Sequence, residues 1–256
     1  MTVFLMVGQS NMSGRGGLKE LPDISNPHVR VWRGEGWETA VEPVVRDKPA
    51  IAAAGMGSAF GTSVYMMTGE DVGLIPCSLG GSRLREWQPG ERLFEAAVAE
   101  TAKALKSGAR LAGILWHQGE SDSKEVESAL TYAKRLRVIM AALIARIREA
   151  AETAGIAERV CAPLPVLVGE LGEYLDGNAD SLYHREINAQ LAEFAALRPE
   201  YALVRARDLP DRGDRLHFSA HAQRRLGIRY ACAWMDTVAA LSPREEICAP
   251  AKAEYV

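Results

Sequence analysis

The residues best suited to chemistry in this 256-residue chain are a serine near its start and an Asp–His pair near its end. Ser10 stands in Gly8-Gln9-Ser10-Asn11-Met12, directly after an apolar run, where a strand end followed by a turn would project its hydroxyl. Asp214 and His217 are three residues apart, so the carboxylate can bind one ring nitrogen and leave the other as a base. An imidazole that takes the proton of a serine hydroxyl activates it for acyl transfer. Taken singly, each motif is more often a structural turn.

Two further polar segments contain groups that acyl transfer needs. Gln118 and Glu120 follow another apolar run; the amide can donate to a developing oxyanion, and the carboxylate is a second group able to orient a histidine. The pair Gly80-Gly81 can direct backbone N–H groups at one point, as the other half of an oxyanion hole. Trp87 stands nearby and can stack on a sugar ring or belong to the core.

Other motifs fail on spacing. The glycines around Ser10 enclose one residue too many for a phosphate-binding P-loop, and Arg15 follows in place of lysine. Met12 occupies the glycine position of a G-x-S-x-G nucleophile elbow. His217 and His221 are four residues apart, but Phe218 stands where the zinc-protease motif has glutamate. The sequence therefore predicts neither a metal nor a cofactor.

Short apolar runs alternate with longer helical patterns, which predicts an α/β fold with a mainly parallel sheet. In such a sheet the polar segments that follow strands meet at one edge, where open α/β folds bind ligands. The expected strands are residues 3–7, 72–76, 111–116, 166–168 and 201–204. The expected helices are residues 58–67, 93–106, 126–153, 181–197 and 220–241.

Residues 13–57 form a long Gly- and Pro-rich insertion after the first strand, with Trp32 and Trp37 in an expected small hairpin. We expect one catalytic domain over residues 1–241 and a C-terminal tail over residues 242–256.

The overall composition is that of an ordinary soluble protein, with 48% hydrophobic residues, 25% charged residues and a net charge of −3. This balance favours neither nucleic acid nor a membrane as partner. The N-terminus lacks the basic region and cleavage site of a signal peptide, and the four cysteines are scattered, so we expect a cytoplasmic protein with reduced thiols. A homo-oligomer is left open.

Four segments in this order resemble the SGNH-hydrolase superfamily, and most of all its carbohydrate esterase family 6 and sialate O-acetylesterase branch. They are Gly8-Gln9-Ser10-Asn11-Met12, Gly80-Gly81-Ser82, His117-Gln118-Gly119-Glu120 and Asp214-x-x-His217. The resemblance implies a flavodoxin-like, three-layer α/β/α fold and hydrolysis of an ester without a metal.

The resemblance also implies roles for these residues. Ser10 would be the nucleophile, His217 the general base, and Asp214 the carboxylate that orients the histidine, with Glu120 as the second choice for that carboxylate. The oxyanion hole would comprise the Ser10 N–H, a glycine of 80–81 and the Gln118 side chain, which replaces the usual asparagine of the superfamily. Further candidates for substrate contact are Gln9, Asn11, Arg15 and Trp87; Arg15 can bind an acidic sugar or form an ion pair.

The predicted activity is removal of short acyl groups, acetyl above all, from a carbohydrate ester through an acyl-enzyme. Two alternatives remain at this point. A lipase or thioesterase of the same superfamily would need an apolar groove, which the polar insertion at 13–57 disfavours. A non-catalytic carbohydrate-binding protein would use Trp32, Trp37 and Trp87 as a stacking platform but would give the Ser–His–Asp set no role.

Overall fold

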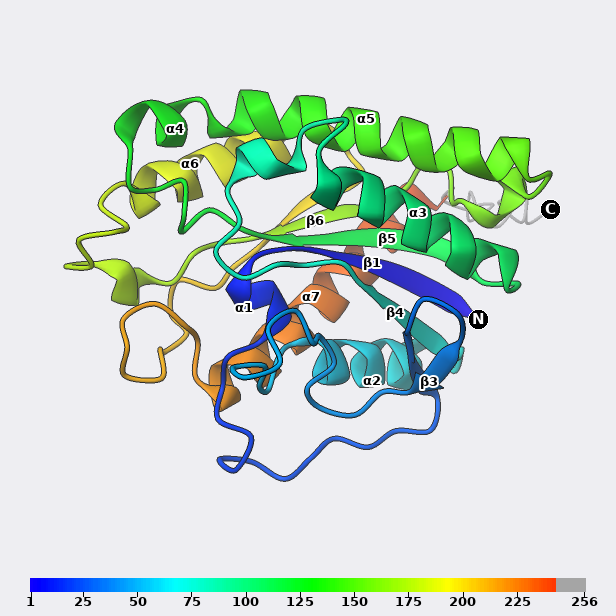
Figure 1. Ribbon diagram of the computed structural model, residues 1–256, viewed down its shortest axis with the longest axis horizontal. Helices are drawn as coiled ribbons and strands as arrows, with labels where there is room; N and C mark the ends of the chain where they lie inside the picture. The colour runs from blue at the N-terminus through cyan, green and yellow to red at the C-terminus, as the bar shows by residue number, and fades with distance from the viewer. Residues whose placement is uncertain (243–256) are drawn as a thin grey trace, which may run out of the picture.

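The computed structural model describes residues 1–242, and its centre is one seven-stranded sheet (Figure 1). The strand order is β3-β2-β4-β1-β5-β6-β7, and every neighbouring pair is parallel except β2 and β3. The strands are β1 (Thr2–Gly8), β2 (Val29–Trp32), β3 (Trp37–Thr39), β4 (Val72–Pro76), β5 (Arg110–His117), β6 (Val166–Gly169) and β7 (Tyr201–Val204).

Helices cover both faces of the sheet, which makes three layers (Figure 1). One face carries α3 (Arg92–Lys106), α5 (Tyr132–Thr153) and α6 (His184–Ala195), and the other carries α2 (Gly57–Thr68) and α7 (Ala220–Leu241). Short helices α1 (Ser10–Ser13) and α4 (Val126–Leu130) and 3₁₀ turns at Leu84–Trp87, Ala157–Arg159 and Glu173–Leu175 complete the elements.

The central strand β1 explains why both layers form. Its residues from 3 to 7 are all apolar and buried, and successive side chains of a strand enter opposite layers. Phe4 packs edge-on against Phe60 of α2 and Trp234 of α7, while Val3 and Leu5 belong to the core under α3 and α5. A strand buried on both faces is the element that this continuous apolar run predicts.

The predicted α/β/α architecture and mainly parallel sheet are confirmed, and all five expected strands are present. The expected helix at 126–153 is divided at Thr131 into α4 and α5. The expected helix at 181–197 begins later, at His184.

The tryptophan hairpin has a larger role than the sequence indicated. Trp32 pairs with Trp37 across β2 and β3, as expected, but β2 also pairs in parallel with β4 and so extends the main sheet. Only the segments on either side of the hairpin remain as loops of the insertion.

The strand order determines where a ligand can bind. With the hairpin set aside, the chain passes from β1 to β4 on one side and then to β5 on the other, which is the order of flavodoxin-like folds. The connections therefore diverge between β1 and β5 at their carboxyl ends, where Ser10 follows β1 and His117 is the last residue of β5. This is the ligand-binding edge of such sheets.

None of the helices within residues 1–242 is long and apolar enough to cross a bilayer. Residues 243–256, which form most of the expected tail, lie outside the described residues.

Candidate active site

Ser10 is held at the sheet edge by a tight exit from β1. Gly8 has φ 137°, and a Cβ atom there would lie 2.1 Å from the carbonyl oxygen of His117 at the end of β5. The chain can turn this close to its neighbour only because residue 8 has no side chain. Ser10 is then the first residue of the buried helix α1.

His217 and Asp214 come from the loop before α7, 207 residues beyond the serine, and meet it directly. The His217 Nε2 atom lies 3.1 Å from Ser10 Oγ, and the Nδ1 atom lies 2.8 Å from Asp214 Oδ2. The second carboxylate oxygen of Asp214 accepts the backbone N–H groups of His217 and Leu216 at 2.8 and 3.0 Å. These hydrogen bonds close the turn and fix the orientation of the Asp214 carboxylate against the His217 ring. Ser219 accepts the Ala222 N–H and caps α7 directly after this turn.

The electrostatics keep His217 uncharged over a wider pH range than a free imidazole. Burial lowers the pKa of His217, and the nearby Arg15 and Arg212 lower it further, against the opposing hydrogen bond and charge of Asp214. Burial alone would raise the pKa of Asp214, but hydrogen bonds from the His217 ring and from two backbone N–H groups outweigh it and keep the carboxyl ionised. A neutral imidazole beside an ionised carboxylate is the resting state of a general base.

Glu120, the second candidate for the acid, contacts a different residue. Its Oε1 atom accepts a hydrogen bond of 2.5 Å from Asn11 Nδ2, and its Oε2 atom is buried with no hydrogen-bond partner within residues 1–242. Burial raises the pKa of Glu120 to about 7, although the Asn11 hydrogen bond opposes the shift. The imidazole therefore has Asp214, and not Glu120, against its Nδ1 atom.

The backbone donors beside Ser10 are not equivalent. Ser10 begins α1, so its N–H has no partner inside the helix, and no acceptor bonds it elsewhere within the described part of the chain. Gly80 packs against the serine, with its Cβ position 3.5 Å from Ser10 Cβ, but its N–H donates to Asp47 Oδ2 at 2.7 Å. Gly81 lines the pocket beside it.

Gln118 is fully buried and does not line the pocket. Its amide nitrogen faces Asp122 Oδ2 at 2.7 Å and two oxygens at 3.1 Å, Gln9 Oε1 and the Ser82 carbonyl. Its oxygen accepts the Tyr132 hydroxyl at 2.6 Å. Gln118 therefore orients the side chain of Gln9, a residue that does line the pocket. The oxyanion role of Gln118 stays a prediction.

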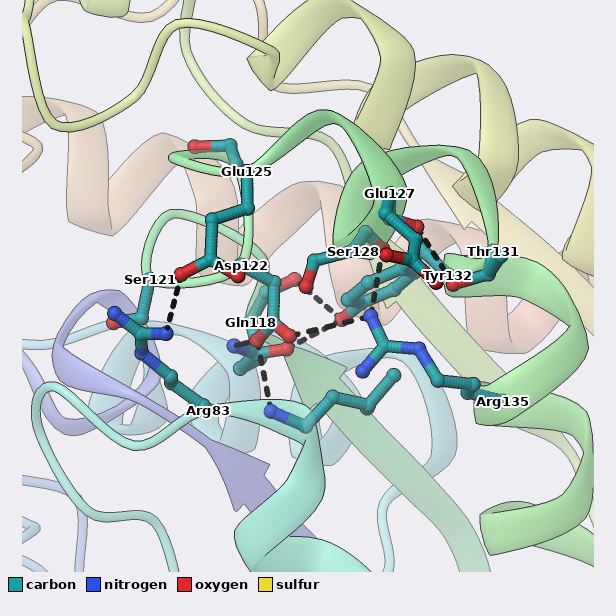
Figure 2. Close-up of polar contacts among 12 residues, drawn as sticks. Arg83, Gln118, Ser121, Asp122, Glu125, Glu127, Ser128, Thr131, Tyr132 and Arg135 are labelled. Atoms are coloured by element: carbon teal, nitrogen blue, oxygen red, sulfur yellow. Dashed lines mark hydrogen bonds and ion pairs between the residues drawn. The ribbon is translucent and has the colours of Figure 1, made fainter.

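Figure 2 shows the polar network behind this amide. Asp122 accepts the Leu84 N–H at 2.8 Å and pairs with Arg135, in addition to Gln118. Asp122 does not cap the following helix, because α4 begins at Val126 with no side-chain cap. Asp122 instead fixes the loop after Gly81 to the segment after β5 and to α5.

Arg15 is buried and paired. Its Nη2 atom lies 2.8 Å from Asp47 Oδ2, both side chains are almost inaccessible to solvent, and Nη1 donates to the Gly14 carbonyl. Hydrogen bonds from Arg15 and Gly80 overcome the effect of burial and lower the pKa of Asp47. Sequence reasoning missed Asp47, because nothing in its neighbourhood along the chain marks it as a partner of residues 15 and 80.

These groups surround one pocket of about 420 Å³ at the carboxyl edge of the sheet. Most of its lining residues are polar or charged, and Ile51 and Leu216 are the main apolar ones. The lining consists of Gln9, Ser10, Arg15, Lys48, Ile51, Gly80, Gly81, Arg83, Glu120, Ser121, Lys124, Asp180, Ser181, Leu216 and His217.

Of the two roles that the sequence left open for Trp87, a sugar contact or a place in the core, the structure supports the core. Trp87 is 1% exposed and packs edge-on against Trp116, and its indole N–H donates to Ser82 Oγ. Trp87 therefore belongs to the core. Trp32 is also buried, in the hairpin beside Trp37. Buried rings cannot form the stacking platform of a carbohydrate-binding surface.

Solved structures of other proteins share this fold. An Arabidopsis thaliana protein matches with a TM-score of 0.78 at 24% identity, over 92% of this chain and 98% of that one. A carbohydrate acetylesterase from Xanthomonas citri matches with a TM-score of 0.60 at 18% identity, over 90% of this chain and 55% of that one. Another, from Sinorhizobium meliloti, has a TM-score of 0.53 at 18% identity and covers 94% and 99%.

The sequence comparisons identify the family. A probable carbohydrate esterase of Arabidopsis thaliana is 29% identical over 254 residues, which cover 91% of this chain and 90% of the relative. The model of the family described as carbohydrate esterase, sialic acid-specific acetylesterase, matches residues 1–236. The resemblance stated from the four motifs is thereby confirmed, and the chain belongs to this family of carbohydrate esterases.

Proposed function

We propose that this protein is a serine esterase that removes acetyl groups from a carbohydrate through an acyl-enzyme, with Ser10 as nucleophile, His217 as general base and Asp214 as the orienting acid. The observation that carries the proposal is the continuous hydrogen-bonded series from Ser10 Oγ through the imidazole to Asp214, open to a polar pocket. Membership of a carbohydrate esterase family supports the substrate class.

The reaction begins when Ser10 Oγ attacks the acetyl carbonyl carbon and its proton passes to His217 Nε2. The new C–O bond leaves a negative charge on the carbonyl oxygen, and the Ser10 N–H, which has no acceptor within residues 1–242, donates to that oxygen in this proposal. One such donor is typically worth about 3 kcal/mol of barrier. The imidazolium then gives its proton to the departing sugar oxygen, and the acetyl group remains on Ser10.

Deacylation repeats these steps with water. His217 removes a proton from a water molecule, the resulting oxygen attacks the acetyl-serine carbonyl, and collapse restores the serine hydroxyl and releases acetate. Asp214 stays ionised throughout and stabilises the imidazolium, consistent with its lowered pKa.

The lining supports a short acyl group and a polar alcohol. A fatty acyl chain needs a continuous apolar wall, whereas the pocket around Ser10 is bordered by charged and amide side chains such as Gln9, Arg83 and Lys124. A panel of acetylated sugars assayed for acetate release, beside p-nitrophenyl esters of increasing chain length, tests this choice. We expect acetate to be preferred; a preference for octanoate would leave a hydrolase but exclude the carbohydrate assignment.

The nucleophile is tested by Ser10→Ala with Ser13→Ala as matched control, since Ser13 is a buried serine of the same helix that bonds Ser78 instead. We expect S10A to lower kcat by ~10³-fold or more and S13A to stay near the parent enzyme. A fluorophosphonate probe should label the parent and S13A but not S10A. Undiminished turnover in a folded S10A variant would exclude the mechanism, and absence of labelling in the parent would favour a binding protein.

A further inference from the structure

One side chain of the Gly8–Met12 motif has no role in the chemistry above. Asn11 follows the nucleophile in α1, is fully buried and uses both ends of its carboxamide on the loop that carries the base. Its Oδ1 atom accepts the backbone N–H of Phe218 at 3.1 Å. Its Nδ2 atom donates to the backbone carbonyl of Leu216 at 3.1 Å.

These two hydrogen bonds hold the backbone on either side of His217. The residues directly before and after His217 are both hydrogen-bonded to the planar carboxamide of Asn11. These bonds restrict movement of the imidazole toward or away from Ser10. Asn11 directly follows Ser10 in the same helical turn. The residue that holds the loop of the base is therefore the neighbour of the nucleophile, and this fixes the distance between His217 and Ser10.

The Asn11 side chain is itself held in place. Glu120 Oε1 accepts from Nδ2 at 2.5 Å, and the Tyr174 hydroxyl lies 3.4 Å from the same nitrogen. The Asn11 main-chain carbonyl accepts the side-chain amide of Gln223 in α7 at 3.1 Å. The segment after β5, the loop before α7 and the start of α7 therefore all contact this one asparagine of α1.

We propose that Asn11 is a positioning residue for the esterase reaction, which fixes His217 against Ser10 by hydrogen-bonding to the backbone on both sides of the histidine, with Glu120 orienting its carboxamide. This inference rests on the proposed function, since it assigns Asn11 an effect on the Ser10–His217 pair. Asn11 acts through His217 and needs no contact with the reacting carbonyl.

The chain contains a matched control. Asn188 of α6 is also buried and bonds a backbone with both ends of its carboxamide, accepting the Leu171 N–H at 2.7 Å and donating to the Leu171 carbonyl at 2.9 Å. It holds no residue of the Ser10–His217–Asp214 set. Asn188→Ala therefore removes a similar pair of buried hydrogen bonds without releasing the base.

The experiment compares Asn11→Ala, Asn11→Ser and Asn188→Ala in the full-length protein, with p-nitrophenyl acetate as substrate and a fluorophosphonate to count competent sites. A loss of alignment by about an ångström typically costs on the order of 100-fold. We expect both residue 11 variants to lower kcat per folded enzyme by about 10- to 100-fold with KM within about threefold, and N188A to keep the parent kcat. The serine variant is the smaller perturbation and covers the case in which N11A does not fold.

The pH profile separates positioning from general destabilisation. Asp214 and Arg212 on its own loop, Arg15 after α1, and Glu120 across Asn11 are the charged groups around the imidazole, and all remain in the variants. Release of the loop exposes the ring to water and weakens the effect of burial that lowers the pKa of His217. The acid limb of kcat/KM should therefore move to higher pH in N11A and N11S and stay in place in N188A.

A folded N11S variant with the kcat of the parent and an unmoved acid limb would overturn the inference. An inactive S10A in the same assay would still support the proposed function. An active S10A would instead defeat the proposed function.

Discussion

At the scale of single residues, the environment of His217 determines the pH range of activity. The base must be neutral to accept the Ser10 proton, and burial lowers its pKa below the ordinary value of 6.5. The neutral form therefore persists as the pH falls through 6.5 and is lost only below the lowered pKa. A profile of kcat/KM against pH for p-nitrophenyl acetate should place the acid limb under pH 6.5; a limb at or above 6.5 would contradict this environment for the imidazole.

The choice between two carboxylates is also a residue-scale question. Asp214 Oδ2 accepts from the imidazole Nδ1, whereas Glu120 contacts Asn11. Removing the charge of a carboxylate that orients a catalytic histidine typically lowers kcat by ~10⁴-fold, because the wrong tautomer is favoured.

We therefore expect Asp214→Asn to lower kcat by ~10³-fold or more, and Glu120→Gln to lower it by less than about tenfold, since glutamine keeps an oxygen for Asn11. Steady-state kinetics of the two isosteric variants decide the assignment. The reverse order of losses would make Glu120 the acid partner.

At the scale of elements, the end of β1 brings Ser10 to the crevice. Gly8 has a positive φ, and a methyl group there would collide with the backbone of β5, which cannot move without breaking the central pairing of the sheet.

Gly8→Ala should therefore be strongly destabilising, by about 3 kcal/mol or more. Gly69→Ala at the end of α2 is the control, since Gly69 also has a positive φ of 71° but no atom within 4 Å of its Cβ position; its cost should be near 1 kcal/mol. Denaturant unfolding of the two variants measures the difference. Equal costs would mean that backbone conformation alone, and not the close approach of β1 to β5, requires the glycine.

At the scale of the whole molecule, Glu120 links global stability to pH. Burial raises its pKa in the folded protein to about 7, above the value of 4.5 expected for an exposed glutamate. A raised pKa contributes stability that is complete below about pH 4.5 and is lost as the pH rises through about 7, because the folded protein must then hold a buried charge.

Glu120→Gln removes this titration. Its free energy of unfolding, relative to that of the parent protein, should therefore increase between pH 4.5 and pH 8, by up to roughly 3 kcal/mol. Urea unfolding at both pH values checks the difference. A constant difference across that range would show that the carboxyl group ionises as it does in water.

The sequence by itself determined the fold class and the chemistry-bearing segments. Short apolar runs and period-3.6 patterns are local properties, so β4, β7 and α7 begin and end where the sequence predicted. The four motifs are also local, and the rule that parallel strands end at one edge predicts their approach without coordinates. The family match confirms the resemblance that those motifs indicated.

Only the tertiary structure decided which groups face one another. The pairing of β2 with β4, the ion pair of Arg15 with Asp47, the direction of the Gln118 amide and the burial of Trp87 all depend on contacts between segments far apart in the chain. The same holds for Asn11, whose partners come from residues 120, 216 and 218. A hydrogen bond is set by distances of a few tenths of an ångström, which emerge only when the packed layers fix all the loops at once.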